Sequence, residues 1–137
     1  MKITTKSRYA IRAIYALLVL NGESEPVSLK KISEYEDISL KYLEQIFSKL
    51  KKAGVVMSTR GISGGYMLAK NPSEITVRQV IYAMDGPIKP VDCIDNQGCT
   101  KSSECAINWL WFELKKDIDI FFDKVTLADL KNKNNCL

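Results

Sequence analysis

The sequence predicts a mainly α-helical protein with a small β wing, organised as a winged helix-turn-helix followed by a long helix. Three observations predict this fold class. Two short amphipathic helical patterns are separated by a turn at residues 37–39, a glycine-rich hairpin pattern follows them directly, and a long apolar helical pattern lies near the C-terminus. Together they give the order helix, turn, helix, wing, long helix.

Length and composition set the scale of the molecule. At 137 residues, with 46% hydrophobic and 26% charged side chains, the chain has the size of one globular domain with room for an appended element. We expect a winged helix at residues 1–86, a cysteine loop at 87–104, and a long helix with a C-terminal tail at 105–137. The longest apolar run, residues 13–20, is too short to span a bilayer and lacks a signal-peptide cleavage site, so a cytoplasmic protein without a membrane partner is expected.

The first helix is expected to begin near Thr4 or Thr5, either of which can serve as its N-cap, and to end before Asn21 and Gly22. An apolar stripe forms the side that packs into the core: Tyr9, Ala10, Ala13, Ile14, Leu17 and Leu18. Basic side chains gather at the exposed start: Lys2, Lys6, Arg8 and Arg12. Taken alone, such a cluster is typical of a solvated first turn.

The next two helices form the helix-turn-helix pattern. Ser28 caps the first of them, and Ser39 caps the second, which ends at Gly54. Apolar residues at three- and four-residue intervals predict a buried face on the second helix: Leu40, Leu43, Ile46, Phe47 and Leu50. Its opposite face carries side chains that can hydrogen-bond base edges or phosphate oxygens: Lys41, Tyr42, Glu44, Gln45, Ser48, Lys49, Lys51 and Lys52. A charged helix face of this kind is most often simply solvated, so its neighbours decide the interpretation.

The hairpin that follows is predicted from a β-branched run at residues 55–59 and an apolar run at 66–69. Its tip, residues 60–65, holds three glycines, which allow positive φ and a close approach of the backbone to another molecule. Arg60 is the charge at this tip, and it suits a phosphate or a minor groove. The alternative is that the glycines only close the hairpin.

The charge distribution favours a polyanionic partner for this half of the chain. Residues 1–70 carry 12 Lys and Arg against 6 Asp and Glu, whereas residues 71–137 carry 8 against 10. The basic half is therefore the half with the helix-turn-helix and wing patterns. We expect it to bind double-stranded DNA.

The C-terminal half begins after a break at Asn71 and Pro72. Thr76 and Gln79 form a capping-box pattern at the start of a short helix that ends at Gly86. Residues 103–125 then form one long helical pattern with apolar side chains on more than one side: Ile107, Trp109, Leu110, Trp111, Phe112, Leu114, Ile118, Phe121, Phe122 and Val125. We assign one side to the winged helix of the same chain and the other to a second subunit in a homodimer. Complete burial in a monomer is the alternative, but a chain this short has few elements left to cover the helix.

Three cysteines stand six residues apart in and after a polar loop at residues 90–104: Cys93, Cys99 and Cys105. In a reducing compartment such thiols seldom form structural disulfides, so metal binding or redox chemistry is favoured. Their spacing differs from the paired steps of most zinc sites and leaves a metal site and reactive thiols both open. Thiolates on a glycine-containing loop can hold an iron-sulfur cluster.

The run Y-L-E-Q-I-F-S-K-L-K-K-A-G-V-V-M-S-T-R-G-I-S-G-G-Y-M-L-A resembles the recognition helix and wing of the Rrf-two family of bacterial winged-helix transcription regulators. The resemblance extends to the N-terminal M-K-I-T-T-K-S-R-Y-A and to the cysteine loop. It implies a homodimeric regulator, a repressor of iron-sulfur cluster biogenesis genes, that binds a palindromic DNA operator. The expected DNA contacts are Lys2, Thr5, Arg8, Ser39, Lys41, Tyr42, Glu44, Gln45, Lys49, Arg60, Gly61, Ser63 and Gly64.

The same resemblance implies that Cys93, Cys99 and Cys105 bind a [2Fe-2S] cluster. The chain departs from the family at the fourth ligand, because the cluster-binding branch has a His three residues beyond the third Cys and this chain has Asn108 there and no His. A nitric-oxide-sensing branch uses an acidic residue on the first helix of the partner subunit, where this chain has Arg8 and Arg12. Asn108 is therefore the expected ligand by position. The alternatives are Asp92, Asp95, Glu104 and Cys136.

Other functions stay open beside this one. An enzyme or electron carrier that uses the same cysteines is disfavoured, because the chain has no His, no glycine-rich cofactor loop and no second cluster motif. A cluster-free regulator whose thiols respond to oxidants or to a small effector is favoured by the missing His. A nitric-oxide-sensing repressor is a further alternative. We expect a regulator and not an enzyme.

Overall fold

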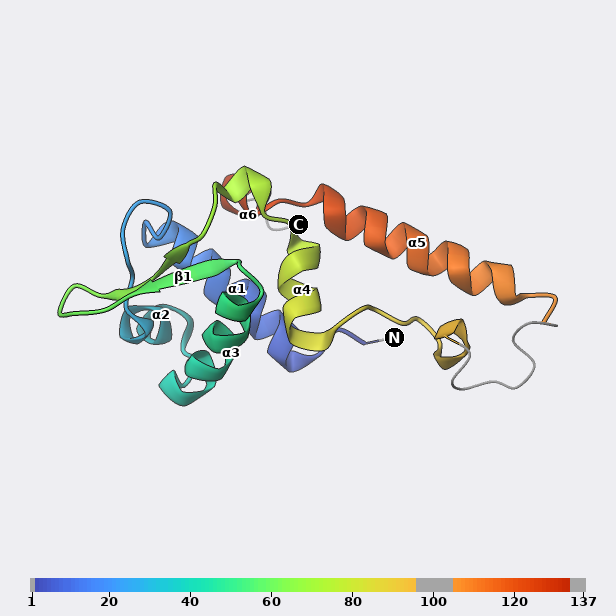
Figure 1. The fold of residues 1–137 in the computed structure, drawn as a ribbon, viewed down its shortest axis with the longest axis horizontal. Helices are drawn as coiled ribbons and strands as arrows, with labels where there is room; N and C mark the ends of the chain where they lie inside the picture. Colours follow the sequence, from blue (N-terminus) through green and yellow to red (C-terminus); the bar gives the residue numbers. More distant parts are fainter. Residues whose placement is uncertain (1, 96–104, 134–137) are drawn as a thin grey trace.

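The computed structural model describes residues 2–95 and 105–133. Within them the chain is mainly helical with one two-stranded antiparallel sheet, which confirms the predicted fold class. A helical body carries the wing on one side, and the long helix α5 (Asn108–Lys124) extends away on the other (Figure 1). Among the described residues, no helix has the length and apolar character needed to cross a bilayer.

The first three helices begin at the predicted cap residues. They are α1 (Thr5–Val19), α2 (Leu29–Glu36) and α3 (Leu40–Lys52). The hydroxyls of Thr4, Ser28 and Ser39 each accept a hydrogen bond from the backbone N–H three residues on, at 3.1, 3.3 and 3.2 Å. Asp37 ends α2 in the left-handed region at φ 55°, which turns the chain sharply into α3. The helix-turn-helix prediction is confirmed.

The buried face of α3 matches the prediction at four of its five positions. Leu43, Ile46, Phe47 and Leu50 are fully buried in the core. The prediction for Leu40 is wrong, since this side chain is 46% exposed. Leu40 is the first residue of α3, and helical side chains lean toward the N-terminus, so it points past the end of the helix instead of onto the core.

The wing consists of β1 (Val56–Thr59) and β2 (Gly65–Leu68), within one residue of the predicted runs. Backbone hydrogen bonds of 2.8 Å in both directions join Val27 to Tyr66 and hold the wing against the segment before α2. A Cβ on Gly65 would lie 2.3 Å from the carbonyl oxygen of Val27. Only glycine therefore allows the wing to lie this close to the helical body.

Helix α4 (Val77–Asp85) follows a single 3₁₀ turn, η1 (Pro72–Glu74), and packs against α1, α3 and α5. The predicted capping box is present, because the Gln79 N–H bonds the Thr76 hydroxyl at 3.4 Å and the Gln79 side chain accepts from the Thr76 N–H at 2.8 Å. Its apolar stripe, Val77, Val80, Ile81 and Met84, is buried. The predictions for this helix are confirmed.

The start predicted for the long helix, residue 103, is wrong for the part that is described. Residues 105–107 form a turn, with the Asn108 N–H bonded to the Cys105 carbonyl at 3.2 Å, and α5 begins only at Asn108. The N-cap residue is Ile107, whose side chain has no atom that can accept a backbone N–H. Cys105 therefore precedes the helix.

Besides the 3₁₀ turn η1, two elements were not predicted from the sequence. One is η2 (Asp92–Asp95), a short 3₁₀ helix that packs against α5. The other is α6 (Leu127–Asn132), whose N-terminus has a capping box formed by Thr126 and Asp129. Leu127 is fully buried in the main core, so the chain returns from α5 to the helical body instead of ending in a tail at this point.

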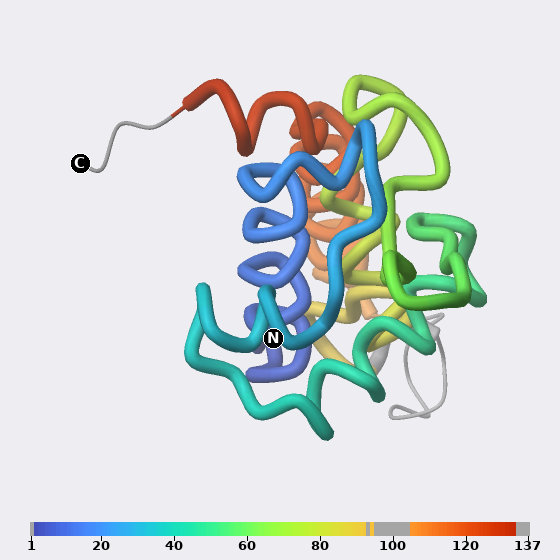
Figure 2. The backbone as a smooth tube through the Cα atoms, turned by 90° about the vertical axis from the view of Figure 1, so that its left-hand side faces the viewer, coloured from blue at the N-terminus to red at the C-terminus, as the bar shows by residue number. Residues whose placement is uncertain are grey.

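The return of the chain after α5 is fixed by backbone pairing with the segment before α4. The Val77 N–H donates to the Val125 carbonyl at 2.8 Å, and the Leu127 N–H donates to the Ile75 carbonyl at 2.9 Å. Helix α6 then packs on α1 and η1, and Figure 2 shows it lying across the end of α1. This pairing anchors the C-terminal end of α5 to the helical body.

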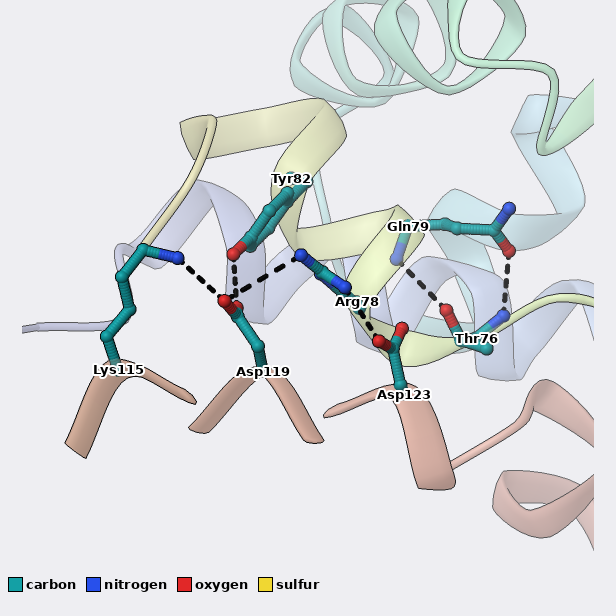
Figure 3. Close-up of polar contacts among 7 residues, drawn as sticks. All are labelled: Thr76, Arg78, Gln79, Tyr82, Lys115, Asp119 and Asp123. Carbon is teal, nitrogen blue, oxygen red and sulfur yellow. Dashed lines mark hydrogen bonds and ion pairs between the residues drawn. The ribbon is translucent and has the colours of Figure 1, made fainter. Parts of the chain in front are cut away.

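A polar cluster bridges α4 and α5 along the length of α5 that faces the body (Figure 3). Arg78 donates to Asp123 at 2.6 Å and lies 3.7 Å from Asp119, whereas Lys115 donates to Asp119 at 2.6 Å. The Tyr82 hydroxyl also donates to Asp119. Desolvation opposes the Asp119 carboxylate, but the hydrogen bonds from Lys115 and Tyr82 outweigh it and lower the pKa of Asp119.

This cluster predicts a pH-dependent contribution to stability from Asp119. Because folding lowers its pKa, the contribution is present above the ordinary aspartate pKa and is lost as the pH falls through the lower folded-state value. We expect Asp119→Asn to reduce the free energy of unfolding at neutral pH by about 1–2 kcal/mol, an effect that disappears in acid. Urea unfolding across an acidic pH series measures it. Asp117→Asn, at an exposed position of the same helix, is the control; a wild type and Asp119→Asn that differ equally at every pH would contradict the prediction.

Candidate nucleic-acid interface

The exposed face of α3 and the first turn of α1 together form one open hollow. Its lining residues are Lys6, Lys41, Glu44, Gln45, Ser48, Lys49 and Lys52. Four predicted contacts of α3 therefore share a single surface with a residue that is distant in the sequence. The hollow combines four cationic side chains with the donors and acceptors of Gln45, Ser48 and Glu44, which is the mixture that base edges and phosphates require.

Positive charge is concentrated where α1 meets α3. The nearby side chain of Lys6 lowers the pKa of Lys49, because the like charge of its ammonium group disfavours the charged form. Two ammonium groups held this close repel one another in the free protein. A bound anion between them would relieve that repulsion, so the junction is suited to a phosphate.

Lys6 was not among the expected contacts, which named Lys2, Thr5 and Arg8 from the same segment. In the structure Arg8 donates to the Thr5 hydroxyl at 3.2 Å, and Lys2 lies beside Asp85 and Lys89 in a separate hollow. A sequence signal for Lys6 does exist. Lys6 is four and seven residues before Ala10 and Ala13, so it lies on the side of α1 that packs into the core.

Arg12, which lies on α1 with these residues, is held away from the hollow. Its guanidinium donates to the Glu36 carboxylate at 3.0 Å and to the Glu36 carbonyl at 2.6 Å, and it lies 5.1 Å from the centre of the Tyr9 ring. These contacts tie α1 to the end of α2. They assign Arg12 a packing role in this structure.

Tyr42 and Ser39, both expected DNA contacts, are partly used inside the protein. The Tyr42 ring is half-buried and packs edge-on against Tyr9, with 5.6 Å between ring centres. The side chain lies at the edge of the polar face, where a neighbouring helix can reach it. The Ser39 hydroxyl oxygen is engaged in capping α3, although its proton remains able to donate.

The wing presents a second concave surface next to the start of α2. Its lining residues are Glu25, Pro26, Ser28, Lys31, Ile62, Ser63 and Gly64. Arg60 and Gly61 are exposed at the tip, and Gly61 has a positive φ of 110°. The wing projects well beyond the helices, as Figure 1 shows, so its tip can reach a partner that also contacts α3.

The structure describes only some of the predicted cluster ligands. Cys93 belongs to η2, which packs against α5, and Cys105 is exposed three residues before that helix begins. Asn108 is the half-buried first residue of α5. Cys99, Glu104 and Cys136 lie outside the described residues, as do the side chains of Cys93 and Asp95.

The described residues do not supply enough ligands for a metal site. Among the side chains that the structure describes, which do not include those of Cys93 and Asp95, no three His, Cys, Asp or Glu residues are grouped so that they could hold an ion. The predicted middle ligand, Cys99, lies outside the described residues. The backbone does place the positions of Cys93 and Cys105 at the same end of α5, and soft thiolates are the ligands that an iron-sulfur cluster prefers. The residues present fit such a cluster in chemistry.

Nearly the whole chain is similar to one family of known proteins. The model of the Rrf2 family, described as iron-dependent transcriptional regulators, matches residues 3–133. The HTH-type transcriptional regulator IscR of Serratia proteamaculans is 42% identical over 137 residues, which cover all of this chain and 83% of that protein. IscR of Yersinia pseudotuberculosis is also 42% identical over the same length.

Solved structures of similar fold carry two different names. CymR, the global cysteine regulator of B. subtilis, is 35% identical with a TM-score of 0.80, and the match covers 98% of this chain and 99% of that one. T. potens IscR is 36% identical with a TM-score of 0.76, covering 98% and 89%. These chains are similar to this one in both fold and sequence.

Proposed function

The chain belongs to the Rrf2 family of transcriptional regulators, and from that premise we propose that it is a cytoplasmic repressor that binds a palindromic DNA operator as a homodimer. One observation carries the DNA-binding part of this proposal. Lys6 of α1 meets Lys49 of α3 in a hollow that α3 also lines with Gln45 and Glu44. Hydrogen-bonding groups beside concentrated positive charge are what a recognition helix needs in a major groove.

In the proposed complex, α3 lies in the major groove and the wing reaches the neighbouring minor groove. Gln45 and Glu44 meet base edges, whereas Lys6, Lys41 and Lys49 meet phosphates. Arg60 enters the minor groove or pairs with its phosphates, because the glycine-rich tip lets the backbone come close. Lys2, Thr5, Arg8, Ser39 and Tyr42 remain proposed contacts at the margins of this surface, together with Gly61, Ser63 and Gly64 of the wing.

The exposed apolar side chains of α5 support the proposed dimer. None of the residues of α5, all of which are described, is buried. One stripe consists of Ile107, Leu110, Leu114 and Phe121, which are 41–60% exposed, and Trp109, Phe112 and Ile120 lie on another side. A second copy of the chain would cover this area through a two-fold contact, and a two-fold dimer reads a palindromic site.

We further propose that Cys93, Cys99 and Cys105 hold a [2Fe-2S] cluster, with Asn108 as fourth ligand by position. When bound, such a cluster supplies a group whose charge and stability respond to oxidation state and to small diatomic molecules. The chain itself supplies three cysteines, of which Cys93 belongs to η2 and Cys105 lies in the turn before α5. The proposed targets are iron-sulfur cluster biogenesis genes, on the basis of the similarity to proteins named IscR.

A second candidate function is a cluster-free regulator that responds through its thiols or through a small effector. The similarity to CymR, which is named a cysteine regulator, favours it. The chemistry of position 108 favours it too, because a carboxamide is a weaker iron ligand than an imidazole and the sequence holds no His. A nitric-oxide-sensing repressor is a third possibility that uses the same cysteines.

Substitutions in the hollow of α3 should separate base reading from phosphate binding. We expect Gln45→Ala to change the preference among related operator sequences by about 1–3 kcal/mol, because a specific base contact is lost. Lys49→Ala should weaken binding to all sequences and lower the salt dependence by about one unit. Selection from a randomised duplex pool, followed by titrations at several salt concentrations, measures both effects. Equal losses on every duplex for both variants would contradict the assignment.

If a second copy of the chain covers the apolar stripe of α5, a charge placed in that stripe should disrupt the dimer. Leu114→Asp would place a carboxylate in an apolar contact, so the dimer should dissociate or the chain unfold. Light scattering and circular dichroism together separate these results. Lys116→Asp puts the same side chain at a polar position of α5 and should leave the dimer intact. The proposed dimer contact would be contradicted if the Leu114→Asp variant were folded and dimeric, or if only the Lys116→Asp variant dissociated.

Anaerobic purification tests the cluster. A [2Fe-2S] centre absorbs visible light, whereas zinc and free thiols do not, so the proposed function predicts a coloured protein. Replacing Cys93, Cys99 or Cys105 by Ala should abolish the colour, and Cys136→Ser should retain it. Iron and sulfide analysis gives the stoichiometry. A colourless wild type that still binds its operator with full affinity would favour the cluster-free regulator.

A further inference from the structure

We infer that Asp85 is a positioning residue for the DNA interface: its carboxylate holds the first turn of α1 so that Lys6 lies against α3. The inference rests on the proposed DNA-binding function and adds to it a residue that does not touch DNA. Asp85 is the last residue of α4 and lies 79 positions from Lys6 in the sequence. The packing of α4 against α1 and α3 brings the two residues to the same place.

The contacts form a closed set that we call the Asp85 clamp: Asp85, Thr4 and Ser7. The Thr4 hydroxyl donates to both carboxylate oxygens of Asp85, at 2.8 and 2.9 Å. The Ser7 hydroxyl donates to one of them at 2.5 Å. Thr4 in turn accepts the Ser7 N–H at 3.1 Å as the N-cap of α1. One carboxylate therefore fixes the residues on both sides of Lys6.

The burial of Ser7 and the direction of the helix dipoles both indicate that the Asp85 clamp stabilises this packing. Ser7 is the one polar residue among the fully buried side chains of the described chain, and its hydroxyl is satisfied by Asp85. A carboxylate is unfavourable at the C-terminus of its own helix, α4, but favourable at the N-terminus of α1. Asp85 therefore gains its stabilisation from α1, and α1 gains a fixed orientation of its first turn.

The position of Lys6 follows from the clamp. Lys6 is half-buried between Thr5 and Ser7, and it lines the α3 hollow with Lys49. Like charge alone would push these two ammonium groups apart. A first turn that is fixed by Asp85 keeps Lys6 beside Lys49 despite that repulsion. The DNA face thus has a preformed phosphate site at the junction of α1 and α3.

A role of Asp85 through its charge and a role through the positioning of Lys6 predict opposite effects of its removal on DNA binding. The carboxylate lies within electrostatic reach of Lys49, whose charge it stabilises. If Asp85 acted through charge alone, its removal would make the surface more positive and DNA binding tighter. If it positions Lys6, its removal weakens binding although the net charge rises.

The experiment uses the full chain and a fluorescein-labelled duplex of mixed sequence, titrated by anisotropy at several salt concentrations. Asp85→Ala should weaken binding and lower the salt slope by about one unit, and Lys6→Ala should do the same. The double variant should lose no more than either single one, because both act through the same contact. Asp85→Asn retains hydrogen-bonding atoms toward Thr4 and Ser7 without the charge, so it should restore the slope. Glu74→Ala, which removes an exposed carboxylate from η1, is the control for net charge.

Ser7→Ala covers the case in which Asp85→Ala fails to fold, because it removes one of the two hydroxyls that bind the carboxylate without changing any charge. We expect it to lower the slope as well, and circular dichroism confirms that each variant is folded. Asp85→Ala with equal or tighter binding and an unchanged slope would overturn the inference, as would additive losses in the double variant. A wild type without salt-dependent DNA binding would instead overturn the proposed function, and the inference with it.

Discussion

Helix α4 contacts α1, α3 and α5 at once, and the burial of its stripe from Val77 to Met84 fixes their relative positions. Both of its ends are also tied to distant parts of the chain. At its start the Val77 N–H pairs with the carbonyl of Val125, and at its end Asp85 holds Thr4 and Ser7. The DNA face and the long helix are therefore positioned by the same short element.

This arrangement gives a physical route between the cysteine segment and the DNA face. The chain passes from Asp85 through Gly86 and Pro87 to Ile88, which is buried in a small cluster that includes Ile3. Ile3 leads directly into the first turn of α1. The segment that leads to Cys93 therefore packs, through Ile88, against the residue just before Thr4, and η2 contacts α5.

The polar cluster between α4 and α5 determines which side of α5 faces its own chain. A helix with apolar side chains on several sides gives no strong preference for which side meets its own chain. Arg78 and Tyr82 of α4 select the side that carries Lys115, Asp119 and Asp123, because charged groups need specific partners when they are partly desolvated. The side with Leu110, Leu114 and Phe121 is thereby left outward, where a second subunit can cover it.

The sequence by itself determined the features that depend on neighbours within a few residues. Caps at Thr4, Ser28, Ser39 and Thr76 and the buried stripe of α3 follow from local hydrogen bonding and the helical period, and the structure confirms them. The same local signals were present for α6, as a Thr-x-x-Asp capping pattern at Thr126, and could have predicted it.

Only the tertiary structure decided which exposed side chains share a surface. The sequence pointed to Arg8 and Arg12 as readily as to Lys6, but Glu36 and Tyr9 hold Arg12, Thr5 holds Arg8, and only Lys6 faces α3. Tyr42 is half-buried for the same reason, because Tyr9 of α1 packs against it. A helical period gives the direction of a side chain around its own axis, whereas its neighbours depend on how helices from distant parts of the sequence pack together.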